Sequence, residues 1–168
     1  MGWIQPFLAE LDQEMVSTRK VLERIPNDKL GWKPHPKSFT AGALATHVVN
    51  MMNWAATTVK QDNFDYAAPG APEYKEEPFE SVEALLGQFD KNTKAIKELL
   101  LTSSEEAMDA PWTLLGGGKV VFTMPRKAVL RSMILSHTIH HRGQLSVYLR
   151  LLDVPVPSIY GPSADEAD

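Results

Sequence analysis

The stretch LRSMILSHTIHHRGQLSVYLRLL, residues 130–152, has the spacing of a helix that is buried along one side. The residues of that side recur every three or four positions, as the roughly 3.6 residues per turn of an α-helix require. The residues predicted to face inward are Leu130, Met133, Ile134, His137, His141, Gln144, Leu145, Tyr148 and Leu152. Pro125 is well placed to begin this helix, because proline is favoured in the first helical turn. The last helix is therefore predicted to carry imidazoles on its buried side.

Three other segments show the same periodicity and predict three more long helices. They cover residues 4–25, 41–60 and 82–101. Thr40 and Ser81 precede two of them and can cap their N-termini, because a hydroxyl oxygen accepts a hydrogen bond from an unpaired backbone N–H there. Four long amphipathic helices predict an all-α four-helix bundle, which residues 1–168 form as a single domain.

Two connections between these helices are unusual. Residues 61–79, QDNFDYAAPGAPEYKEEPF, contain three prolines and no helical or strand period. A connection of this length is usually functional or mobile, so we expect it to border a pocket. Residues 111–124, PWTLLGGGKVVFTM, place three glycines between two short apolar runs and predict a short hairpin or flap before the last helix.

The composition excludes several classes of protein. The apolar fraction is 43%, and no uninterrupted apolar run approaches the roughly 20 residues of a transmembrane helix, so no membrane partner is expected. A net charge of −4 with scattered basic residues argues against direct nucleic-acid binding. The N-terminus lacks the basic and apolar regions of an export signal, so a cytoplasmic location is expected. Without cysteine, any transition metal must be bound by nitrogen and oxygen ligands.

His137 and His141 are four positions apart, so their side chains lie on one face of the predicted helix, about 5–6 Å apart at Cβ. Both are close to the centre of the inward side, whereas His140 is turned to one side. An inward histidine is more often a hydrogen-bonded core residue than a ligand, and a pair supplies fewer ligands than most transition-metal sites need. The pair alone leaves a structural role and a metal site both open.

His47 is the third candidate ligand. It lies in the predicted second helix, facing inward or nearly so, one turn before the core position Met51. Three neutral imidazoles in a dry interior would leave several nitrogen atoms without partners, at a cost of about 1–3 kcal/mol each. A metal ion at about 2.0–2.1 Å from three nitrogens removes this cost. Three inward histidines therefore favour a metal site.

Other polar residues have weaker assignments. Gln144 can orient a ligand or a bound water, and its structural alternative is an amide bonded to a loop carbonyl. Arg142 and Arg150 are predicted to point away from the inward side and to hold the C-terminal tail or a partner subunit. His35, between two prolines, is predicted to be a surface residue. Asp90 lies near the inward side of its helix but off it, so no general base is assigned.

Three stretches also resemble the DinB-like proteins, a broad group of proposed metalloenzymes named for a damage-inducible bacterial member. The stretches are FTAGALATHVVNM (39–51), SHTIHHRGQLSVYLR (136–150) and VPSIYGPSADE (156–166). The resemblance runs over nearly the whole chain and implies that His47, His137 and His141 are the metal ligands. It also implies a four-helix bundle with divalent nickel, zinc or a similar ion, and commonly a homodimer.

Relatives in this group include transferases and isomerases that use low-molecular-weight thiols, so the resemblance implies a thiol cosubstrate as one option. Three histidines leave at least one coordination position open, as in catalytic metal sites. A water bound there can act as a hydroxide nucleophile near pH 7, and a bound thiol would be deprotonated. The hypothesis is a metal-dependent enzyme that acts on a small molecule by hydrolysis or thiol-dependent transfer. The alternative is a non-catalytic metal-binding or dimerising helical bundle.

Overall fold

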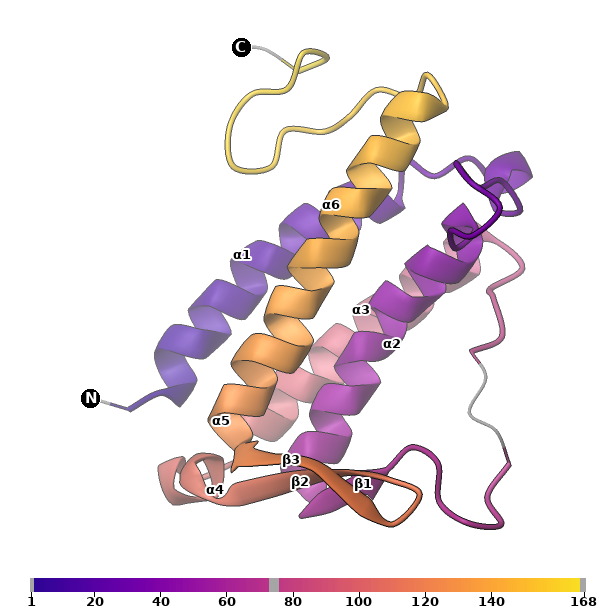
Figure 1. Cartoon of the computed structure of the whole chain (residues 1–168). Coiled ribbons are helices and arrows are strands. Elements are labelled where there is room, and N and C mark those ends of the chain that lie inside the picture. Colours follow the sequence, from indigo (N-terminus) through magenta and orange to yellow (C-terminus); the bar gives the residue numbers. More distant parts are fainter. Residues whose placement is uncertain (1, 73–75, 167–168) are drawn as a thin grey trace.

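Long helices make up most of the computed structural model, which describes residues 2–72 and 76–166 (Figure 1). The helices are α1 (Ile4–Leu22), the short η1 (Asn27–Lys29), α2 (Ala41–Lys60), α3 (Val82–Leu101), α4 (Glu105–Asp109), α5 (Arg126–Val129), the wider turn η2 (Leu130–Leu135) and α6 (Ser136–Leu151). The segments α5, η2 and α6 follow one another without a break and form one long helical stretch. The prediction of a mostly helical chain is confirmed.

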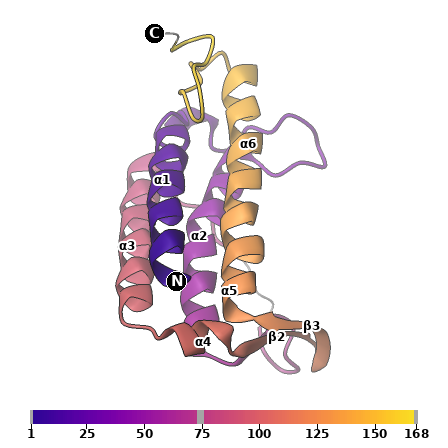
Figure 2. The ribbon, with the colours of Figure 1, turned by 90° about the vertical axis from the view of Figure 1, so that its left-hand side faces the viewer.

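The long helices lie side by side around a shared apolar core (Figures 1 and 2). α1 contacts α3 and α6, and α2 contacts the same two helices. Burial of apolar surface between them is the main stabilising contribution. The largest fully buried apolar side chains are Leu11, Leu22, Leu44, Met52, Leu85, Phe89, Ile96, Leu100, Met108, Leu130 and Leu135. No helix within the described ranges is long and apolar enough to cross a bilayer.

The two predicted helix caps are confirmed. The Thr40 hydroxyl accepts a hydrogen bond from the backbone N–H of Ala43 at the start of α2, at 3.1 Å. The Ser81 hydroxyl does the same for Ala84 at the start of α3, also at 3.1 Å. Each cap satisfies a backbone donor that the first turn of a helix leaves unpaired.

A three-stranded sheet lies at one end of the helices, so the protein is not purely α-helical (Figure 1). The antiparallel strands β2 (Pro111–Gly116) and β3 (Lys119–Pro125) form the hairpin that was expected before the last helix. The prediction of an all-α fold is wrong because it missed the strand β1 (Asn63–Asp65), which pairs with β2 in parallel. Three residues are too few to show an alternating pattern, and their pairing depends on a strand far along the chain.

The hairpin turn is held by a carboxylate from the neighbouring strand. Gly117 and Gly118 have φ values of +61° and +77°, which glycine adopts without strain and which suit a two-residue hairpin loop. The Asp65 carboxylate accepts hydrogen bonds from both of their backbone N–H groups, at 2.9 and 2.7 Å. The connection that contains β1 is thereby tied to the hairpin.

The turn η2 changes which residues of the last helical stretch face inward. Leu130, Ile134 and Leu135 are buried, whereas Met133 is 40% exposed. A π-type turn contains one residue more than a regular α-helical turn, so the buried positions shift along the sequence. The prediction that Met133 is buried is wrong, although its side chain lines a cavity beside His47 and His137. Such turns are frequent at functional sites, and this one ends directly before α6 and His137.

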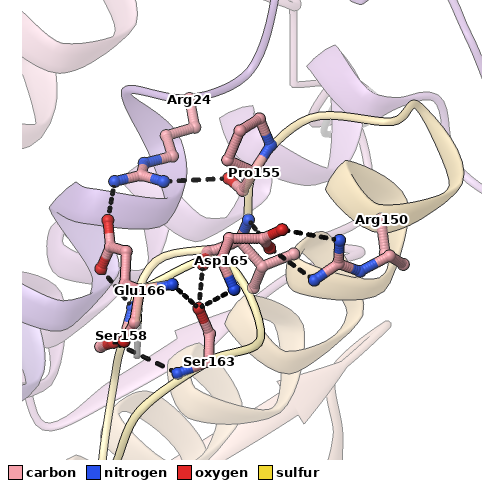
Figure 3. Close-up of polar contacts among 8 residues, drawn as sticks. Arg24, Arg150, Pro155, Ser158, Ser163, Asp165 and Glu166 are labelled. Carbon is pink, nitrogen blue, oxygen red and sulfur yellow. Dashed lines mark hydrogen bonds and ion pairs between the residues drawn. The ribbon is translucent and has the colours of Figure 1, made fainter. Parts of the chain in front are cut away.

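The C-terminal tail folds over the end of the helices opposite the sheet (Figures 1 and 2). Arg150 of α6 pairs with Asp165 at 2.5 Å, and Arg24, just after α1, pairs with Glu166 (Figure 3). The Ser163 hydroxyl accepts hydrogen bonds from the backbone N–H groups of Asp165 and Glu166, at 3.1 and 3.0 Å. The prediction that Arg150 holds the tail is confirmed.

Arg142 also holds the tail, but it does so from the interior. Its side chain is 2% exposed, so the prediction that it points away from the inward side is wrong. One guanidinium nitrogen donates to the Glu14 carboxylate of α1 at 2.6 Å, and another donates to the Tyr160 hydroxyl at 2.5 Å. The Tyr160 hydroxyl donates in turn to Glu14 at 2.8 Å. Periodicity cannot detect this network, because its members are distant in sequence.

Candidate metal site

Three histidines from two helices meet near the middle of the protein. His47 comes from α2, and His137 and His141 come from α6. One ring nitrogen of each lies within 4.8 Å of the others, and Nε2 of His137 is 2.7 Å from Nε2 of His141. The ring of His47 lies edge-on to the other two, with ring centroids 5.3 Å from His137 and 4.9 Å from His141. The structure therefore brings together the three residues that the sequence pattern selected.

The remaining two histidines lie outside this cluster. His140 is exposed, and its ring contacts that of His141 without joining the group of facing nitrogens. His35 is exposed in the loop before α2, where its Nδ1 accepts a hydrogen bond from the Lys37 backbone N–H at 3.1 Å. Both agree with the positions expected from the sequence.

The outer nitrogens of the clustered histidines are occupied by hydrogen-bond acceptors. The Nδ1 of His47 lies 3.0 Å from Oε2 of Glu76, and the Nδ1 of His141 lies 2.7 Å from Oε1 of Gln144. His137 makes a hydrogen bond with the backbone of Met133. An oxygen acceptor at Nδ1 fixes the proton on that nitrogen and leaves Nε2 with a free lone pair. Partners of this kind usually orient metal-binding histidines.

Glu76 is the site residue that sequence reasoning missed. It belongs to the connection of residues 61–79, and its side chain is 16% exposed where it contacts His47. A carboxylate in an aperiodic loop carries no signal of direction, so nothing in the sequence distinguishes Glu76 from its acidic neighbours. Residues 73–75 of the same connection lie outside the described part of the chain.

Burial favours the neutral form of His137 and His141. It is the main cause that lowers the pKa of His137 below its ordinary value, and the nearby His47 lowers that pKa further. Burial is also the main cause of the lowered pKa of His141, against a hydrogen bond with Gln144 that raises it. A neutral imidazole is the form that binds a metal ion, so both rings are ready to act as ligands near pH 7.

The geometry of the cluster fits a transition-metal ion. Metal–nitrogen bonds of about 2.0–2.1 Å place two ligands of a tetrahedral site about 3.3 Å apart. The observed separations, from 2.7 Å to at most 4.8 Å, bracket this value. Two ring nitrogens that face one another at 2.7 Å need either a shared proton or a cation between them. The cluster is therefore compatible with a divalent metal.

Cavities flank the cluster, and two of them include His47 in their lining. The outer pocket has a volume of about 770 Å³, and its lining includes His47 and Glu76 together with Phe39 and Trp54. Several residues of the 61–79 connection line it, which confirms that this connection borders a pocket. The second cavity, the inner chamber, has a volume of about 120 Å³ and lies between α2, the hairpin and the last helical stretch. The strands of the hairpin line this chamber, but its glycines do not.

Sequence comparison relates the chain to proteins of Bacillus subtilis. It is 26% identical to YrdA over 161 residues, which cover 95% of this chain and 89% of YrdA. It is 30% identical to YjoA over 135 residues, which cover 79% of this chain and 80% of YjoA.

Two solved structures share the fold. A DinB-like protein from Bacillus cereus ATCC 10987 has a TM-score of 0.74 at 23% identity, over 93% of this chain and 97% of that one. The DinB-like protein YjoA from Bacillus subtilis has a TM-score of 0.68 at 22% identity, over 92% of this chain and 97% of that one. The profile of the DinB family matches residues 4–168, nearly the full length. The chain therefore belongs to the DinB family.

Proposed function

We propose that this protein is a divalent-metal-dependent enzyme that acts on a small molecule, built on a four-helix bundle that the chain forms as one domain. The observation that carries the proposal is the pair of Nε2 atoms of His137 and His141, 2.7 Å apart, with His47 facing them. Acceptors occupy the outer nitrogens of these rings, so the inner nitrogens face one another and are available to hold a cation.

His47, His137 and His141 would hold Zn²⁺ or Ni²⁺ and leave at least one position for water or substrate. When bound, such an ion supplies Lewis acidity, which lowers the pKa of a coordinated water or thiol. Hydrolysis and thiol-dependent transfer both use this property. Residues of the protein orient the ligands, since Glu76 holds the ring of His47 and Gln144 holds the ring of His141.

The outer pocket supports a small-molecule substrate. Its volume of about 770 Å³ falls within the range typical of pockets for small ligands. That space also accommodates a low-molecular-weight thiol beside the substrate, as a transfer reaction requires. His47 lines the pocket, so a molecule bound there lies beside the proposed ligands.

We further propose a cytoplasmic homodimer that binds neither membranes nor nucleic acid. Val147 and Leu151 lie one turn apart on α6, and each is 56% exposed. Exposed apolar side chains on one helical face support a contact with a second copy. Light scattering of the purified protein gives the mass that decides between monomer and dimer.

The proposed function is tested by metal content and turnover. Elemental analysis of untagged protein should find one Zn²⁺ or Ni²⁺ per chain, and the metal-loaded protein should convert members of a panel of small esters, amides and thiol acceptors. Metal binding without any turnover in such a panel would favour a non-catalytic metal-binding bundle. If no loading condition gives stoichiometric metal, the proposal is contradicted.

Glu76→Gln should weaken Zn²⁺ binding by about 10–100-fold, the usual effect of losing an outer partner of a metal-binding histidine. The amide keeps the shape of the side chain but loses the charge that faces His47. Competition with a fluorescent chelator measures the affinity. Glu77→Gln is the matched control, because Glu77 is an exposed neighbour in the same connection and should bind Zn²⁺ as the wild type does.

The metal-free protein should lose stability as the pH falls below about 6.5. The pKa values of His137 and His141 are lowered in the folded state, so the unfolded chain binds protons first as the pH falls. The free energy of unfolding from urea titrations should therefore decrease from pH 7.5 to pH 5.5. In the double variant His137→Gln/His141→Gln, the free energy of unfolding should depend less on pH. An equal dependence in the wild type and the double variant would contradict the assignment of the effect to these two histidines.

A further inference from the structure

We propose that the inner chamber binds a compact apolar group of the substrate. The inference rests on the proposed function and narrows its substrate class. The chamber lies directly beside the site, because its lining includes both His47 and His137. The rest of the lining is mainly aliphatic and aromatic, with Val129, Leu114 and Trp112 among its members.

The size of the chamber restricts what can enter. Its volume is about 120 Å³, close to that of an apolar cavity of about 150 Å³ that stays dry and binds benzene or xenon. A branched or cyclic group of about five or six non-hydrogen atoms is therefore the expected occupant. An apolar wall of this kind offers water too few partners to hold it, so the chamber favours an apolar guest.

The polar groups of the wall have little to offer a guest. Trp112 is 2% exposed, and its Nε1 is too deeply buried to meet a molecule in the chamber. The Thr58 hydroxyl in the lining already donates to the Trp54 carbonyl at 2.9 Å. A polar group on the guest would lose its hydrogen bonds to water without replacing them, so the wall selects an apolar group.

The chamber and the outer pocket adjoin at the site. His47 and Trp54 line both cavities. A substrate whose apolar end fills the chamber would place its next atoms beside His47 and His137 and direct its remainder towards the outer pocket. The substrate class is thus a small molecule with a compact apolar end and a reacting centre attached to it.

Xenon, benzene and a matched pair of cyclic molecules test the proposal. Crystals of the full chain under xenon pressure should show xenon in the chamber, and benzene should bind in solution, measured by titration of the tryptophan indole NMR signals. Metal-free protein should bind cyclopentane at least about tenfold more tightly than cyclopentanone, because the wall of the chamber is mainly apolar. A preference for the ketone would overturn the apolar character given to the guest.

Variants that fill the chamber provide the controls. Val129→Phe should lower benzene affinity at least tenfold, and Leu114→Phe serves the same purpose if the first variant does not fold. Val121→Phe, a matched change on the exposed part of β3, should leave binding unchanged. Equal benzene affinity in the folded chamber variants and the wild type would overturn the proposal. Zn²⁺ titrations run in parallel separate the two ideas, because Zn²⁺ binding without probe binding rejects the chamber alone.

Discussion

Replacement of His141 by alanine should lower the affinity of the protein for Zn²⁺ by more than about 100-fold. Loss of a residue that only hydrogen-bonds to a metal-binding histidine costs up to about 100-fold, and loss of the histidine itself should cost more. His141 is 8% exposed, its Nε2 faces the Nε2 of His137, and its Nδ1 is held by Gln144. Removing this ring takes away one of three ligands and leaves the other two without a complete site. Chelator competition and elemental analysis measure the loss.

His140→Ala is the matched control for this experiment. His140 is adjacent on the same helix, but it is exposed and lies outside the cluster. We expect wild-type Zn²⁺ affinity for this variant and an unchanged helical circular dichroism spectrum for both variants. Equal losses in the two variants, or no loss for His141→Ala, would contradict the assignment of the ligands. Loss of helicity together with metal would indicate a structural rather than a catalytic ion.

Replacement of Arg142 by alanine should lower the free energy of unfolding by about 3–5 kcal/mol, the usual effect of removing one partner of a buried ion pair. The Arg142 and Glu14 side chains are only 2% and 8% exposed, and they lie 2.6 Å apart. Without the guanidinium, the Glu14 carboxylate would remain buried without its charged partner, with the Tyr160 hydroxyl still donating to it from the tail. Urea denaturation followed by circular dichroism measures the change.

Two further variants separate this effect from a general weakening of the tail. Arg150→Ala removes an exposed ion pair with Asp165 and should change the free energy of unfolding much less than Arg142→Ala does. The double replacement Arg142→Met/Glu14→Leu should recover most of the lost stability, because no unpaired charge remains buried. If the double variant is as unstable as Arg142→Ala, the loss comes from packing rather than from the charge.

The histidine cluster was predictable because helical geometry relates sequence spacing to position on a face. His137 and His141 are one turn apart, and the period of α2 places His47 on the side that faces α6. The caps at Thr40 and Ser81 were predictable for a similar reason, since the contact is between residues three positions apart. Local rules of this kind need no knowledge of the rest of the chain.

The features that sequence reasoning missed all depend on distant contacts or on irregular backbone. Glu76 reaches His47 from a connection without any period. Strand β1 exists only through its pairing with β2. Arg142 is buried because Glu14 and Tyr160 complete its hydrogen bonds from opposite ends of the sequence. Met133 is 40% exposed because it lies at a cavity between the last helical stretch and the hairpin, which the helical period does not reveal.

The wide turn η2 makes the last helical stretch tolerant of a shorter chain just before the cluster. A π-type turn holds one residue more than an α-helical turn over about the same rotation, so a single-codon deletion within residues 130–135 would close the stretch into a regular helix and leave His137 and His141 facing α2. The regular helix α2 has no such turn, so a deletion between Ala41 and His47 would rotate His47 by about 100° relative to the start of that helix. Loss of one codon is thus expected to spare the site before one ligand helix and to disable it inside the other.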